Sequence, residues 1–299
     1  RASVWLPGGG YTRGAWRVLA GTALALAART RLAIPRSYDP LRARFSHIAQ
    51  GLSPESLGSE PLLTEEDVAE ALGVRSKARP RLLGFYTSEG LEFAFYRYGI
   101  LPHLHRLGYD RLHVELDEVS GGGRVRVMGF SDGKDQVLME AVLEKKQLAG
   151  STVLFVNWLS LRNPRARFSD KRPQLPGQEV PGLGLARETA ELLGLMARRL
   201  VLDGVAFRPA WFHIAYAGRY RARFVDPARQ GRFEALMRDL KHLSLLKATT
   251  AVAQGRVRLD GKPYQWEADD MVYWLSRDEK QAEAEIAAER ERAHFTVEA

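Results

Sequence analysis

The pattern of hydrophobic and polar positions divides the chain into a short N-terminal unit, a proline-interrupted stretch and a longer region. Residues 2–6 (ASVWL) form an apolar run that predicts a buried strand, and the Ala- and Leu-rich segment 12–29 predicts a helix. Prolines interrupt residues 31–80, so only short helices are expected there, beginning at Ser53 and Thr64. We expect this stretch to wrap as a connector between two domains.

From residue 82 the pattern predicts strands and helices in turn. Period-two alternation predicts strands at 111–118 and 124–130, followed by the hairpin signal SDGKD. Further strands are expected at 82–86, 136–148, 152–163 and 205–207, further helices from Ser88, at 185–202, around 210–220 and around 228–243, and a closing hairpin around Asp260 and Gly261. The predicted fold class is therefore α/β, with a mixed, mostly antiparallel sheet in this region.

The last residues are charged and helix-prone, which indicates a solvated helix or a frayed end. We therefore divide the chain into the N-terminal unit (1–30), the connector (31–80), the α/β domain (81–276) and a charged helical tail (277–299).

Composition narrows the classes of function. The net charge is +8, but the basic residues are scattered without interleaved aromatic residues, so nucleic-acid binding is not expected. The chain has no cysteine, which excludes disulfides, thiolate nucleophiles and cysteine-ligated zinc. The apolar run at 18–28 is too short to span a membrane. We interpret it as a buried helix rather than a secretory signal, and expect a cytoplasmic protein with no membrane partner.

Three glycines, Gly8 to Gly10, precede Tyr11 between the predicted N-terminal strand and helix. Consecutive glycines permit positive φ and a close approach of backbone, and they would hold the next residue at the carboxyl edge of the strand. A tyrosine held there is a hydrogen-bond donor for the oxyanion that forms when water adds to a carbonyl. Tyr11 is therefore a candidate catalytic residue, and the alternative is a glycine-rich turn with an incidental tyrosine.

This GGGY element, with Trp16 and the small-residue patch LAGTALALA in the next helix, resembles the last catalytic element of the histone deacetylase and acetylpolyamine amidohydrolase family. The resemblance covers about residues 2–30, departs at Pro7, and implies the edge of an arginase/deacetylase-type domain. It implies that Tyr11 faces a catalytic zinc and polarises the amide carbonyl of an acetylated amine. The family's zinc ligands, two aspartates and a histidine, lie upstream of this element, so no metal ligand is assigned here.

That resemblance, together with the missing initiator Met, implies that the chain is the C-terminal fragment of a longer deacetylase-family protein. Its partner would be the upstream deacetylase domain, which would hold the zinc. His103 and His105 are two residues apart on a predicted helix and point to different faces, so they are poor joint metal ligands.

A second candidate site is the loop at 168–184, which runs into the predicted helix at 185–202. A glycine-spaced loop at the start of a helix offers backbone N–H groups and the positive end of the helix dipole to a phosphate or pyrophosphate. An arginine in the first turn would add a charge-assisted contact. The candidate cofactor-binding residues are Gln178, Gly182, Leu183, Gly184 and Arg187. The alternative is a Pro/Gly turn that only starts the helix.

The order of elements over about residues 82–230, with this loop, is similar to that of the GNAT acyltransferase superfamily. In that superfamily a Q/R-x-x-G-x-G/A loop holds the pyrophosphate of acyl-CoA, and a tyrosine of the following helix often protonates the departing thiolate. The resemblance implies that role for Tyr220, with Tyr216 as the runner-up. The sequence departs at Glu179, where Gln or Arg is expected, and at Asn157, where a carboxylate base would be useful.

The GNAT resemblance implies transfer of an acyl group from acyl-CoA to a free amine. The alternative is a non-catalytic acyltransferase-like binding or interaction module. Two further expectations concern packing. His213 is interpreted as a packing residue in preference to a substrate contact, and six aromatic residues are expected in the core. These are Phe85, Tyr86, Phe93, Phe95, Tyr96 and Tyr98.

Overall fold

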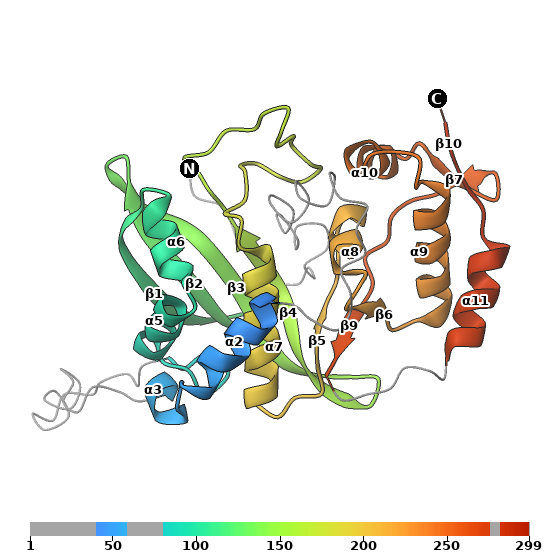
Figure 1. Ribbon diagram of the computed structural model, residues 1–299. Coiled ribbons are helices and arrows are strands. Elements are labelled where there is room, and N and C mark those ends of the chain that lie inside the picture. Colours follow the sequence, from blue (N-terminus) through green and yellow to red (C-terminus); the bar gives the residue numbers. More distant parts are fainter. Residues whose placement is uncertain (1–39, 59–79, 276–281, 299) are drawn as a thin grey trace, which may run out of the picture.

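The computed structural model describes residues 40–58, 80–275 and 282–298, and Figure 1 shows their arrangement. The described helices are α2 (Pro40–Gln50), α3 (Pro54–Gly58), α5 (Ser88–Arg97), α6 (Ile100–Arg106), α7 (Ala186–Arg199), α8 (Phe212–Gly218), α9 (Pro227–Asp239), α10 (Leu245–Ala253) and α11 (Glu283–Arg292). The described strands are β1 (Asp110–Val119), β2 (Gly122–Ser131), β3 (Lys134–Leu148), β4 (Ser151–Leu161), β5 (Gly204–Phe207), β6 (Arg223–Phe224), β7 (Val257–Leu259), β8 (Lys262–Pro263), β9 (Met271–Trp274) and β10 (Phe295–Val297).

A seven-stranded sheet has the order β1-β2-β3-β4-β5-β9-β6, and a small sheet has the order β10-β7-β8. Strands β1 to β4 form an antiparallel meander, in which Asp132 and Gly133 have φ of 51° and 78°, as a type I′ hairpin turn requires. The crossover through α7 makes β5 parallel to β4, and β9 and β6 add antiparallel pairs. The predicted mixed, mostly antiparallel sheet is confirmed.

Strands β4 and β5 pair over only the first part of β4. The parallel register ends at Val156 and Phe207, whereas β4 continues to Leu161. On its other side, the register of β4 with β3 shifts by one residue at Asn157, which is the mark of a β-bulge. The two parallel strands therefore separate where β4 changes its register.

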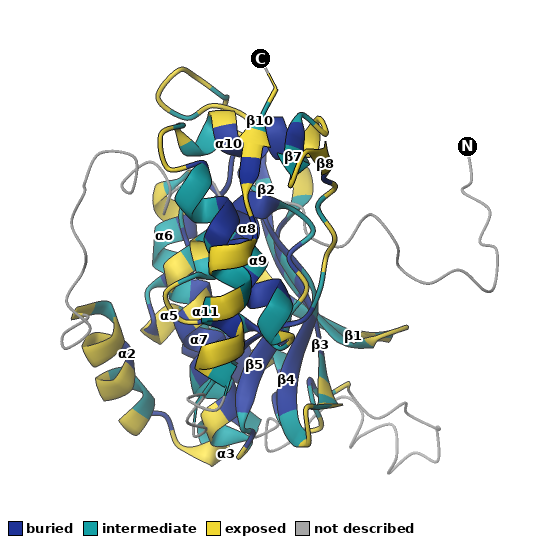
Figure 2. Cartoon of the chain, turned by 90° about the vertical axis from the view of Figure 1, so that its right-hand side faces the viewer, coloured by how far each residue is buried: buried dark blue, intermediate teal, exposed yellow. Residues whose placement is uncertain are grey.

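The main core lies between the meander and helices α5, α6 and α7, which cover one face of the sheet (Figure 1). Its fully buried side chains come from both layers, for example Ile100 and Leu104 of α6 and Leu138 and Leu154 of the sheet. Figure 2 shows the same layering as buried residues concentrated along β4, β5 and the inner faces of the helices. The alternation that predicted β1 and β2 places Val114, Val125 and Val127 on this buried face.

A second apolar cluster holds α8, α9 and α10 against β6 and β9. Phe212, Phe224, Phe233 and Trp266 make mutual edge-to-face contacts, with ring centroids 5.4–6.2 Å apart. The expected charged helix near the C-terminus is present as α11, which buries Ile286 and packs on α9 instead of standing free in solvent.

The predicted strand at 82–86 is wrong. Leu83 and Gly84 have φ of 58° and 74°, and Leu82 and Tyr86 close the segment with an isolated bridge. Because two successive left-handed residues reverse the chain, the apolar side chains of this segment reach the core from a tight turn. The apolar run is therefore a tight turn whose side chains pack into the core, and it is not a strand.

The aromatic cluster expected in the core divides between core and surface. Tyr86 and Tyr98 are buried, whereas Phe93 is 41% and Tyr96 is 63% exposed. A helix that lies on a sheet buries only one face, so aromatic residues on both faces of α5 cannot all be covered. Helices α2 and α10 were not predicted from the sequence pattern.

Several predictions concern residues outside the described part of the chain. Within residues 2–30 these are the predicted strand, the GGGY element with Tyr11 and the predicted helix. The helix expected from Thr64 also lies outside the described residues. Within residues 40–58, 80–275 and 282–298, no helix has the length and apolar character needed to cross a lipid bilayer.

Candidate functional site

The loop before α7 crosses the edge at which β4 and β5 separate. The backbone N–H of Asn163, just after β4, donates to the carbonyl of Pro181 at 2.8 Å, so the second half of the loop lies beside the end of β4. His103 Nε2 of α6 donates to the carbonyl of Leu183 at 2.9 Å. These two bonds fix the glycine-containing part of the loop at the carboxyl edge of the parallel strand pair.

The predicted glycines lie at the N-terminus of α7. Gly182 and Leu183 are buried, and Gly184 has φ of 86°, in the left-handed region that favours glycine. In the described part of the chain, no acceptor is recorded for the backbone N–H groups of Gly184 and the next two residues. Arg187 is exposed in the first turn of α7. This arrangement of donors at the positive end of a helix suits an anionic oxygen.

Gln178 has a different surrounding from the glycines that follow it. It is 5% exposed, its Oε1 accepts from the N–H of Leu175 at 3.0 Å, and its carbonyl accepts from Gln174 Nε2 at 2.6 Å. Its Nε2 is buried and has no partner among the residues that the structure describes. The side chain therefore stabilises the turn around Gly177, where an added Cβ would lie 2.5 Å from Nε1 of Trp211 at the start of α8.

Glu179, which occupies the position where Gln or Arg was expected, is exposed and forms an ion pair with Arg162. The Nη2–Oε2 distance is 3.3 Å. The arginine offsets part of the repulsion that this carboxylate would exert on a phosphate.

Three carboxylates of the meander form ion pairs with arginines on the sheet face opposite the helices. Arg126 lies 3.0 Å from Glu115, and Arg124 lies 3.8 Å from Glu140. The side-chain hydrogen bond from Arg124 lowers the pKa of Asp117. A carboxylate with a lowered pKa is a weaker general base. These three carboxylates therefore have a structural role, in a row of ion pairs with Arg124 and Arg126.

Asn157, at the bulge of β4, is also committed to a structural contact. Its Nδ2 donates to the carbonyl of Gly121 in the β1–β2 turn at 2.6 Å. The bulge thus ties two hairpins together, and no carboxylate stands in its place.

A cavity of about 660 Å³ lies between α8, α9 and α10, beside β6 and β9. Phe212, Leu240 and Ala248 form part of its apolar lining and are buried. Tyr220, the predicted proton donor, lies on the rim and is 74% exposed. None of the five predicted cofactor residues lines this cavity, so it does not unite Tyr220 with the glycine loop.

The guanidinium of Arg219 contacts both tyrosines at the rim of the cavity. It lies 3.7 Å from the ring centroid of Tyr216 and 4.0 Å from that of Tyr220, which places it against both rings. Its Nη1 donates to the carbonyl of Tyr216 at 2.5 Å, and its Nη2 donates to the hydroxyl of Tyr220 at 2.7 Å. The runner-up Tyr216 and the candidate Tyr220 are therefore brought together by one cation.

The other charged groups of the lining are mostly paired. Arg221 forms an ion pair with Glu191 of α7, and Arg223 forms one with Glu283 of α11. By contrast, neither Arg219 nor Lys241 has a carboxylate partner within the described ranges. No carboxylate of the described residues therefore compensates the positive charge of these two side chains at the rim.

His213 is a packing residue, as interpreted from the sequence. It is 0% exposed, and its Nδ1 lies 3.0 Å from the hydroxyl oxygen of Thr249 on α10. Burial lowers the pKa of His213 to about 4, so it is neutral at physiological pH. Its Nε2 is buried without a partner among the described residues.

The sequence reasoning missed this cavity because it missed α10. The signal was present: Ser244 accepts from the N–H of Lys247 as the N-cap, and small or apolar residues follow at helical spacing. The described part of the chain contains no group of three or more His, Asp or Glu side chains that would hold a metal ion.

Comparison of the chain with protein-family models, with curated protein sequences and with solved structures finds no match.

Proposed function

We propose that the α/β domain (81–276) binds acyl-CoA and transfers its acyl group to an amine, with the pyrophosphate held at the N-terminus of α7. The observation that carries the proposal is the set of N–H donors at Gly184 and the next two residues, beside the end of β4. Ligands of sheets with parallel strands bind outside the carboxyl ends of those strands, where neighbouring connections diverge. A pyrophosphate there would accept these N–H groups and be stabilised by the helix dipole.

The arrangement of elements gives further support. An antiparallel meander leads through the crossover helix α7 to a parallel strand, and then to α8 and an antiparallel edge. This order agrees with the similarity to GNAT acyltransferases inferred from the sequence. The ion pair between Glu179 and Arg162 reduces the one electrostatic objection to a phosphate at this loop.

In the proposed reaction the amine nitrogen attacks the thioester carbonyl and releases one proton to solvent water, the C–S bond breaks, and the departing thiolate accepts a proton from a side chain that solvent then reprotonates. We propose Tyr220 as the proton donor. Its hydroxyl oxygen accepts a hydrogen bond from Arg219, which leaves its own proton available for donation. Because β4 carries no carboxylate, the amine would react as the free base, and the rate would rise with pH toward the pKa of the amine.

The second candidate is an acyl-CoA-binding module without turnover. The observation that favours it is the hydrogen bond from Asn157 to the carbonyl of Gly121. The residue at the bulge of β4 is thus an amide with a structural contact and not a general base. Binding would then use the same N–H groups, but no thiol would be released.

Calorimetry of the 299-residue chain with acetyl-CoA and with CoA tests both candidates. We expect both ligands to bind, and we expect Arg187→Glu to weaken binding about tenfold, since it places a negative charge in the first turn of α7. Arg198→Glu makes the same charge change in the last turn of the same helix and should leave affinity unchanged. Absence of binding to the parent chain would overturn the enzyme and the binding module together.

Turnover separates the two candidates. The chain has no cysteine, so every thiol released from acetyl-CoA in the presence of an amine panel comes from CoA. Thiol release that disappears in Tyr220→Phe supports transferase activity with Tyr220 as the acid. Binding without thiol release supports the module.

We also propose that residues 2–30 are the C-terminal edge of a zinc-dependent deacetylase domain, in which Tyr11 would stabilise the oxyanion of an acetylated amine. The sequence resemblance alone supports this proposal, because these residues lie outside the described part of the chain. The genomic DNA upstream of Arg1 tests it. An open reading frame that encodes an Asp-x-His zinc motif would support it, and a start codon close to Arg1 would refute it.

A further inference from the structure

We infer that the cavity between α8, α9 and α10 binds an amphipathic carboxylate, with its apolar body on the cavity floor and its charged end at the rim near Arg219 and Lys241. The inference does not depend on acyl-CoA binding at α7. The cavity volume of about 660 Å³ falls in the range of small-molecule sites, which is roughly 300–1,000 Å³.

The floor of the cavity is apolar. Met237, Leu243 and Leu245 are half-buried and supply most of its apolar surface, and Phe212 and Leu240, each 2% exposed, lie in the same part of the lining. An inorganic anion would leave this surface hydrated, whereas an alkyl or aryl body would remove it from water. The floor therefore selects a ligand with an apolar portion.

Arg219 supplies a fixed cation at the rim. A guanidinium has five N–H donors, and the recorded bonds to the Tyr216 carbonyl and the Tyr220 hydroxyl use only two of them. Both aromatic rings hold its plane in place, which reduces the entropy cost of binding an anion. A planar carboxylate matches the remaining edge of a guanidinium better than a compact ammonium would.

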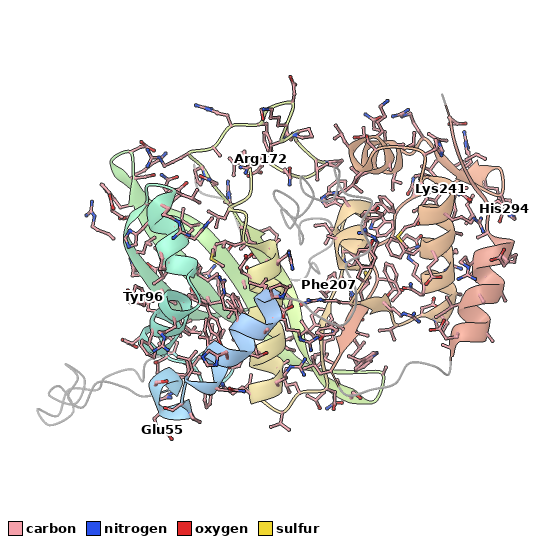
Figure 3. The ribbon with its side chains drawn as sticks, viewed as in Figure 1. Glu55, Tyr96, Arg172, Phe207, Lys241 and His294 are labelled. Atoms are coloured by element: carbon pink, nitrogen blue, oxygen red, sulfur yellow. The ribbon has the colours of Figure 1, made fainter. Side chains whose placement is uncertain are left out.

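Lys241 adds positive potential to the same rim. Figure 3 shows Lys241 at the end of α9 nearest to α10. Lys241 is exposed, and it has no hydrogen-bond or ion-pair partner in the described part of the chain. Leu245, the first residue of α10, and Ala248 line the cavity, so the first turns of that helix border the same space.

The two carboxylates of the lining do not neutralise these cations. Glu234 Oε1 accepts from Gln230 at 2.9 Å, and its Oε2 lies 3.2 Å from Arg290 of α11. Glu283 is paired with Arg223. Since both carboxylates already have cationic partners, no free anion for an amine lies among the described lining residues, and these residues favour a negative group.

Calorimetry and tryptophan fluorescence of the 299-residue chain test the inference, because Trp274 lines the cavity. The probes are decanoate, decanol and decylamine, each below its aggregation concentration. We expect decanoate to bind, decanol to bind about tenfold more weakly because it lacks the charge, and decylamine not to bind. Acetate should not bind, because it lacks the apolar body.

Charge variants locate the site. Lys241→Glu should weaken decanoate binding about tenfold. Lys262→Glu makes the same charge change on β8, where the side chain is exposed and outside the cavity, and should leave binding unchanged. Arg219→Gln is the second variant, and its fold is checked by circular dichroism. Equal binding of decanoate and decanol would overturn the inference, as would unchanged decanoate binding in both Lys241→Glu and Arg219→Gln.

Discussion

The two ends of the large sheet are built in different ways. Strands β1 to β4 are neighbours in sequence and in space, and a continuous hydrophobic core joins them to α5, α6 and α7. At the other end, β9 (Met271–Trp274) lies between β5 (Gly204–Phe207) and β6 (Arg223–Phe224), so its neighbours come from much earlier in the chain. The first end follows from local patterns, whereas the second depends on contacts between distant segments.

Arginine side chains hold this second region together. Arg238 of α9 donates to the carbonyls of Arg290 and Ala293, both at 2.7 Å. Arg232 of the same helix lies 3.0 Å from Glu289 of α11. In this region, side chains that bond to other helices do what the backbone pairing of neighbouring strands does in the meander. The second region is therefore expected to be more sensitive to small changes at helix contacts.

The largest expected effect comes from Gly231→Ala in α9. A Cβ at this position would lie 2.7 Å from the carbonyl oxygen of Ile286 and 2.7 Å from the Cβ of Glu289 on α11. Because backbone cannot yield as a flexible side chain does, the substitution should destabilise the docking of α11 by about 3 kcal/mol. Hydrogen exchange should show reduced protection in α11, with β1 to β4 unchanged.

If Gly231→Ala reduces protection equally throughout the large sheet, the two regions unfold as one unit and the comparison fails. If protection of α11 is unchanged, the close helix contact does not exist in solution.

The next largest effect depends on pH. His213 stays neutral in the native state down to about pH 4, whereas an unfolded histidine takes up a proton near 6.5. Between these values the unfolded state binds more protons, so stability falls as the pH drops. Stability should be about 2 kcal/mol lower at about pH 5 than at about pH 7.5, from the pKa difference of this one group.

His213→Gln provides the comparison for that measurement, because its amide still reaches toward Thr249 but does not titrate. Urea denaturation of both proteins at the two pH values gives the difference. An equal loss of stability in parent and variant would show that His213 is not the group responsible.

The contrast between the two regions explains how far the sequence predicted the fold. The alternation at 111–118 and 124–130 and the turn at Asp132 and Gly133 are local, and all were confirmed. The strand β9 was missed because it is short, and its pairing with β5 and β6 is set by distant contacts. The segment 82–86 was misread since burial of apolar residues does not distinguish a strand from a tight turn.

The candidate site divides in the same way. The glycine loop and its place before α7 could be read from residue spacing, and Gly184 has the backbone conformation that only glycine adopts readily. The cavity could not be read in this way. Its rim combines Arg219 and Tyr220 after α8 with Lys241 after α9, and only the packing of three helices brings them around one space.

The smallest expected effect is a gain in stability at the junction of the two regions. Gly194 lies inside α7, and a Cβ there would lie 3.8 Å from Cε1 of Tyr273 on β9, an ordinary contact distance. Gly194→Ala should therefore stabilise the protein by about 0.5–1 kcal/mol, because alanine loses less backbone entropy in a helix. Urea denaturation measures the change. The same substitution has opposite signs at Gly231 and Gly194, since the nearest neighbours include backbone 2.7 Å away in one case and only a side chain at ordinary contact distance in the other. A destabilised Gly194→Ala would mean that α7 and β9 pack more tightly than these distances allow, and that the two regions share one rigid junction.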